Sequence, residues 1–240
     1  MAGAYIGRNG RTGSGLERAI SLSCDATSWS SDTGAAGLGV PVSVWPLGSG
    51  SVLSGCLVEA FSQAGDLVVS TIVAEADAFV NADHRVLVLC PARQVPIVEQ
   101  VWARASASVR SLLRVEAVTA QNLGTRLVSL TSSVGLLLVD HRRCAGEGFW
   151  LAAADAIRLG GLLAVVCTSP DPLVHAALTT GVRERGWRYI QHIVATTSTE
   201  LDTEVTASTT RPAIPGQVHR RAHRDVFLFS PIEDAGEVSR

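Results

Sequence analysis

Short continuous apolar runs recur along the chain, and each ends at a polar residue or a turn. Runs of this kind are typical of strands that are buried on both faces of a parallel sheet. They predict seven strands, over residues 67–71, 85–90, 113–119, 135–140, 162–168, 187–195 and 225–229.

Between these runs, apolar residues recur at helical spacing. They predict helices over residues 52–64, around 74–79, over 95–107, over 148–159 and from Pro172 to about Arg185. Gly160 and Gly161 are expected to cap the C-terminus of the helix over 148–159. Residues 120–134 do not favour either structure, and residues 41–46, bounded by prolines, are expected to be extended.

Alternating strands and helices indicate an α/β fold, with a mostly parallel seven-stranded sheet and helices on both faces. The last two strands follow one another through a polar loop, residues 196–217, which predicts a C-terminal antiparallel pair. We expect one domain over residues 41–230. Residues 1–40, rich in Gly, Ser and Thr, are expected to be disordered or loosely packed, and residues 231–240 to form a polar tail.

Composition narrows the function classes. The formal net charge is -2, which argues against a strongly basic nucleic-acid coat, and all 20 positive residues are Arg. The lack of Lys excludes a Walker-type lysine and a Schiff-base lysine. Five scattered cysteines without a C-x-x-C pair predict reduced thiols, and no apolar run is long enough for a membrane helix. We therefore expect a cytoplasmic protein that is not bound to a membrane.

Asp140 ends the fourth predicted strand and is followed by His141, Arg142 and Arg143. Because open α/β sheets bind ligands at the carboxyl ends of their strands, Asp140 is expected to line a site if one exists. The alternative is structural: Asp140 caps the next turn, or pairs with Arg142 or Arg143.

Five stretches, in this order and spacing, resemble the S-adenosylmethionine-dependent DNA amino-methyltransferases. They are residues 43–45 (SVW), 64–69 (AGDLVV), 159–166 (LGGLLAVV), 186–194 (GWRYIQHIV) and 223–229 (HRDVFLF). The resemblance covers roughly residues 41–230. It implies a Rossmann-like class I methyltransferase fold, with S-adenosylmethionine as the cofactor if one is bound.

The resemblance places the cofactor at four positions. Ser70 and Thr71 stand where the family's glycine loop begins, but residues 70–77 contain no Gly. Cys90, followed by proline, stands where an acid would bind the ribose hydroxyls. Gln121, or its neighbour Asn122, matches the residue near the adenine amino group.

The resemblance also implies catalytic positions at Asp140, His141 and Arg143. The family has an acid, Asn or Ser, then two prolines and an aromatic residue that stacks on the flipped base. Here the acid is kept, while His and two Arg follow it. Arg143 could stack by its guanidinium plane, but its charge opposes a cationic methyl donor.

These departures predict a methyltransferase-like pseudoenzyme that acts by binding DNA or another nucleic acid, or a protein partner. The alternative is an active DNA amino-methyltransferase that uses Asp140. Arg220, Arg221 and Arg224, before the last strand, are candidate phosphate contacts. No metal site is predicted. The pair His141/Cys144 has no further ligands nearby in sequence. His219 and His223 flank Arg220 and Arg221 and are expected to belong to a solvated basic turn. A third hypothesis is binding of some other small ligand at the same strand ends.

Overall fold

The computed structural model describes residues 41–47, 52–81, 84–144, 146–197 and 223–232. The predicted disordered segment 1–40, the predicted tail beyond residue 232, and Arg220 and Arg221 lie outside these residues. None of the described helices is long and apolar enough to cross a membrane.

The described part contains one mixed sheet of eight strands. They are β1 (Val42–Leu47), β2 (Leu67–Ser70), β3 (Arg85–Cys90), β4 (Leu113–Ala117), β5 (Val134–Asp140), β6 (Ile157–Cys167), β7 (Trp187–Thr197) and β8 (His223–Pro231). The order across the sheet is β1-β7-β8-β6-β5-β2-β3-β4. Neighbouring strands are parallel except that β8 runs antiparallel to both β6 and β7. This confirms the predicted architecture, with one strand more than expected, because the extended segment at 42–47 pairs with β7.

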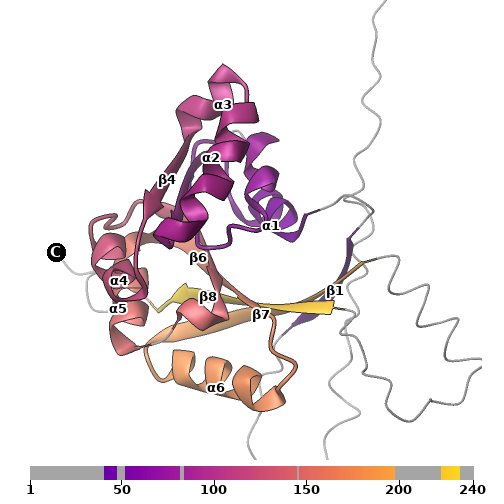
Figure 1. Ribbon diagram of the computed structural model, residues 1–240. Helices are drawn as coiled ribbons and strands as arrows, with labels where there is room; N and C mark the ends of the chain where they lie inside the picture. The colour runs from indigo at the N-terminus through magenta and orange to yellow at the C-terminus, as the bar shows by residue number, and fades with distance from the viewer. Residues whose placement is uncertain (1–40, 48–51, 82–83, 145, 198–222, 233–240) are drawn as a thin grey trace, which may run out of the picture.

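Helices cover both faces of this sheet. They are α1 (Leu53–Phe61), α2 (Val95–Arg104), α3 (Ala107–Leu112), α4 (Ala120–Val128), α5 (Glu147–Ala156) and α6 (Pro172–Arg183), with 3₁₀ helices η3 (Ala76–Asn81), η4 (Ala92–Gln94) and η5 (His141–Arg143). Figure 1 shows α1, α2 and α3 gathered on one side of the sheet and α6 on the other. The ambiguous segment 120–134 thus supplies α4, and the predicted helix 95–107 is divided into α2 and α3.

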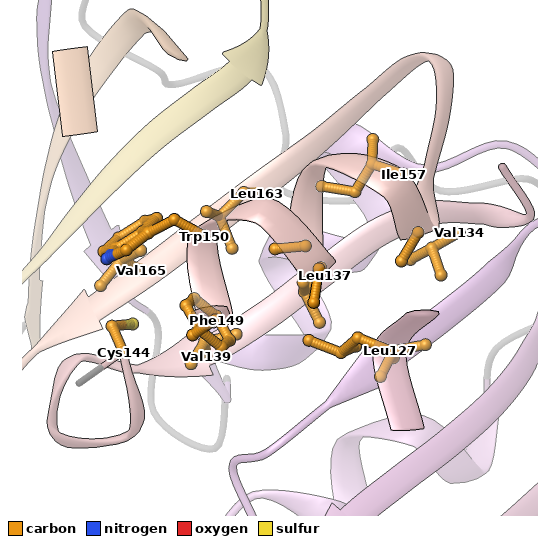
Figure 2. Packing of buried hydrophobic residues seen from close by; sticks show 14 of the residues in the cluster. Leu127, Val134, Leu137, Val139, Cys144, Phe149, Trp150, Ile157, Leu163 and Val165 are labelled. Atoms are coloured by element: carbon orange, nitrogen blue, oxygen red, sulfur yellow. The ribbon is translucent and has the colours of Figure 1, made fainter. Parts of the chain in front are cut away.

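The core consists of two apolar layers, one on each face. One layer packs the side chains of α1, η3 and α2 against the sheet, and the other packs those of α4, α5 and α6. Figure 2 shows the second layer, in which Phe149 and Trp150 of α5 lie over Val139 and Val165. Because successive side chains of β5 enter opposite layers, the strand that ends in Asp140 is buried from Val134 to Val139.

One predicted boundary is wrong. Gly160 and Gly161 do not cap α5; they lie inside β6, which begins at Ile157. Ile157 pairs with Val134 and Leu162 pairs with Leu136, so the register shifts between them. Gly160 takes φ +73° at this irregularity, where glycine is favoured.

Candidate functional site

β2 and β5 lie side by side, but the chain leaves them in opposite directions across the sheet. β2 continues to β3 on one side, and β5 continues to β6 on the other. Their carboxyl ends therefore mark the position where open α/β sheets place ligands. Ser70 and Asp140 end these two strands, so the structure brings the predicted cofactor loop and the predicted catalytic position together.

Asp140 is held by the residues that follow it. The backbone N–H and Nε of Arg142 donate to Asp140 Oδ1 at 3.0 and 2.8 Å, and Arg142 Nη2 donates to Oδ2. Nδ1 of His141 lies 3.4 Å from Oδ1. Burial alone would raise the pKa of Asp140, but the hydrogen bonds and charge of Arg142 outweigh it and hold that pKa below its usual range. Asp140 is thus an ionised carboxylate that both caps η5 and pairs with Arg142.

Arg143 points the other way, toward β3. Its Nη1 donates to the carbonyl oxygen of Leu89 at 3.1 Å, so the guanidinium spans from η5, after β5, to the end of β3. The side chain is half-buried, and burial lowers its pKa. The Arg143 side chain therefore reaches across the end of β2, which lies between β5 and β3.

The segment after β2 is attached to β5 instead of turning away from it. Thr71 N–H donates to Leu138 O at 2.9 Å, and Asp140 N–H donates to Thr71 Oγ1 at 3.2 Å. Ser70 is fully buried, and its Oγ accepts from the N–H of Ile72 at 3.0 Å. Thr71, Val73 and Ala76 are also buried.

Glu75 fixes the far end of this segment. Its Oε2 accepts from the N–H and Oγ of Ser54, in the first turn of α1, at 2.8 and 2.6 Å. Its Oε1 pairs with Arg224 at the start of β8. Arg224, predicted as a phosphate contact, is therefore engaged by a carboxylate, although its side chain remains partly exposed.

The remaining predicted cofactor positions lie at the ends of β3 and β4. Cys90 is fully buried, and burial raises the pKa of its thiol. Gln121 is exposed in the first turn of α4, where Thr119 caps Asn122 N–H. Their roles stay predictions. The four described cysteines Cys56, Cys90, Cys144 and Cys167 are free thiols.

Three histidines surround the buried carboxylate of Asp225 in β8. Nε2 of His192 lies 2.9 Å from Oδ1, while Nε2 of His175 and of His223 each lie 3.7 Å from Oδ2. His192 also stacks on Phe227, with ring centroids 4.7 Å apart. In the described part of the chain, no group of three or more His, Cys, Asp or Glu side chains is arranged to hold a metal ion.

Sequence reasoning missed Glu75, Arg93, and two of the histidines beside Asp225, His175 and His192. Arg93 lies in η4, just beyond the end of β3, so the strand-end argument that selected Asp140 could have selected it. Glu75 gave no such signal, because its partners Ser54 and Arg224 lie far away in sequence. Asp225 has only His223 close in sequence, while His175 and His192 are distant.

Neither the family models nor the curated proteins gave a match to this chain. Solved structures do. The glycopeptide N-methyltransferase MtfA aligns over 75% of this chain and 86% of its own in complex with sinefungin, at 9% identity and a TM-score of 0.53. Its complex with S-adenosylmethionine aligns over 80% and 93%, at 9% identity and a TM-score of 0.52. A TehB-like methyltransferase from Corynebacterium glutamicum aligns over 76% and 90%, at 12% identity and a TM-score of 0.50. The sheet order and these similarities give the chain the Rossmann-like fold of class I S-adenosylmethionine-dependent methyltransferases.

Proposed function

We propose that this chain is a methyltransferase-fold protein that does not transfer methyl groups and acts by binding a nucleic acid or protein partner. One observation carries the proposal: arginines hold the carboxyl ends of β5 and β3. The guanidinium of Arg142 donates hydrogen bonds to the Asp140 carboxylate, and Arg143 Nη1 donates to Leu89 O. A target amino group would have to displace the first contact, and a cofactor at the end of β3 would meet the second.

The residues at the strand ends do not fit S-adenosylmethionine. Its sulfonium is a cation, and Arg143 would place a second positive charge close to it. The end of β3 offers the buried thiol of Cys90 in place of a carboxylate for the ribose hydroxyls. The segment after β2 has no glycine, and its Thr71 and Val73 side chains are buried in the protein. We therefore derive no methyl-transfer step for this chain.

Free thiols in the described cysteines and exposed arginines beside the strand ends support a cytoplasmic binding protein. Fluorescence anisotropy with a labelled DNA duplex, at low and raised salt, discriminates the two partner classes. Salt-sensitive binding identifies nucleic acid. No binding at low salt assigns the role to a protein partner.

A methylation assay tests the loss of catalysis. The chain is incubated with methyl-labelled S-adenosylmethionine and DNA, beside the variant Asp140→Ala. The expected incorporation is the same low background for both proteins, because Asp140 is already engaged by Arg142. Incorporation that depends on Asp140 would refute the proposal.

The second candidate is an active DNA amino-methyltransferase that uses Asp140. It is favoured by the position of this ionised carboxylate at the switch point between β2 and β5. Under this candidate, Arg142→Ala frees Asp140 and increases methyl incorporation, whereas Asp140→Ala abolishes it. No incorporation by the parent chain or by Arg142→Ala would exclude the candidate.

A further inference from the structure

Three arginines gather where β3 and β5 end. Arg93 is exposed in η4, while Arg142 and Arg143 belong to η5. Arg93 follows the last residue of β3 by three positions, and Arg143 reaches the same strand end through its hydrogen bond to Leu89 O. Asp140 balances one of the three guanidinium charges through its bidentate pair with Arg142. Three arginines and one carboxylate give this part of the sheet a net positive charge.

Arg143 is the member of this cluster with donors to spare. A guanidinium carries five N–H donors, and within the described residues Arg143 makes one hydrogen bond, from Nη1 to Leu89 O. Burial of its charge and the nearby Arg93 both lower its pKa, against the opposing effects of Cys90 and Asp140. A half-buried cation in this state is stabilised strongly by an anion that accepts from its free N–H groups.

The backbone also contributes positive charge at the carboxyl ends of β3 and β5. The chain enters α2 from β3 and α5 from β5, so both helices begin at this edge of the sheet. Neither N-terminus has a side-chain cap. Val95 N–H in α2 donates to Ala92 O and Phe149 N–H in α5 donates to Gly146 O. The partial positive charge of the two helix N-termini still favours an anion at the strand ends.

We infer that the carboxyl ends of β3 and β5 bind a phosphate-bearing ligand, with Arg143 as the main contact and Arg93 as the second. Planar guanidinium groups match the oxygen geometry of phosphate. Nucleotide phosphates and a nucleic-acid backbone share this chemistry. The inference rests on the proposed function in one respect, because a sulfonium cation and a phosphate require opposite charge at this position.

Calorimetric titration of the full chain tests it with ADP, pyrophosphate and adenosine. ADP and pyrophosphate are expected to bind, and adenosine, which has no phosphate, is not. Arg143→Gln should weaken the binding of both anions at least about tenfold, because it removes a charge-assisted hydrogen bond to the phosphate. Arg143→Lys keeps the positive charge but loses the paired N–H donors of the guanidinium, so it should weaken anion binding less than Arg143→Gln does.

Arg183→Gln is the matched control. Arg183 is exposed in the last turn of α6, whose C-terminus lies at the opposite edge of the sheet, so this variant should bind both anions as the parent chain does. Thermal melting of each variant shows that it is folded. A DNA oligonucleotide without terminal phosphates identifies the source: if it competes with ADP, the ligand is a nucleic-acid backbone, and if it does not, the ligand is a free nucleotide.

Two results would overturn the inference: no binding of either anion by the folded chain, or equal binding by Arg143→Gln and the parent. A parallel titration with S-adenosylmethionine separates this failure from that of the proposed function. If neither the anions nor S-adenosylmethionine bind, the phosphate site is wrong and the loss of methyl transfer stands. If S-adenosylmethionine binds, the proposed function fails as well.

Discussion

Residues near the start of β5, at the opposite end of the strand from Asp140, are packed too tightly to accept a larger side chain. A Cβ atom at Gly135 in β5 would lie 2.6 Å from Cγ and Oδ2 of Asp66. Asp66 has little freedom to move, because Arg158 and the N–H of Gln63 hold its carboxylate. Glycine at position 135 is therefore required by packing against a fixed ion pair.

Gly135→Ala should lower the free energy of unfolding by about 1–3 kcal/mol, the usual effect of overpacking. Urea denaturation measures it. The control is Gly148→Ala in α5, where an added Cβ meets nothing within 4 Å, so stability should be unchanged or slightly higher. Equal effects at the two positions would contradict the packing argument.

Asp66 also makes stability depend on pH. Burial alone would raise its pKa, but Arg158 and Gln63 N–H lower it below the usual value of 3.8. A lowered pKa stabilises the folded state above the unfolded pKa, and this contribution is lost as the pH falls through the folded pKa. Asp66→Asn should therefore be less stable than the parent by about 1–3 kcal/mol at pH 7, and the difference should shrink near pH 3. A difference that is the same at both pH values would argue against an ionised Asp66.

At the scale of elements, Glu75 joins three parts of the fold. It lies in the segment after β2, accepts from the first turn of α1 and pairs with the start of β8. Fixing this segment keeps it packed on the sheet rather than free to form a cofactor loop. The segment therefore takes a structural role at the position where the resemblance implied binding.

Glu75→Gln should lower the melting temperature and speed amide hydrogen exchange in the first turn of α1, because the buried cap loses its charge and Arg224 loses its partner. The expected loss of stability is about 1–3 kcal/mol. Asp77→Asn is the matched control, since Asp77 is an exposed acid in the same segment. Similar losses in both variants would show that Glu75 has no special role.

Apolar runs predicted the strands well because burial on both faces leaves a simple pattern in sequence. The start of β6 was missed because a register shift at Gly160 and Gly161 looks like a helix stop. At the site, the structural alternative predicted for Asp140, a turn cap that pairs with Arg142, is confirmed, since the two residues are close in sequence. Contacts such as Glu75 with Ser54 depend on the packed fold, and no local pattern encodes them.

At the scale of the whole molecule, the fold follows that of the methyltransferases, whereas the side chains at the strand ends do not follow the pattern of the resembling family. Strand order and layers follow the class I methyltransferase fold. The side chains at the strand ends differ from those that the resemblance implies, because Arg142 pairs with Asp140 and Arg143 donates to Leu89 O. A fold alone does not decide activity. The proposed function therefore depends on the positive charge at the carboxyl ends of β3 and β5.

Calorimetric titration of S-adenosylmethionine into the intact chain tests this claim most directly. No saturable heat is expected up to millimolar ligand, because Arg143 and the buried segment after β2 oppose the cofactor. Saturable binding with a micromolar dissociation constant would contradict the account.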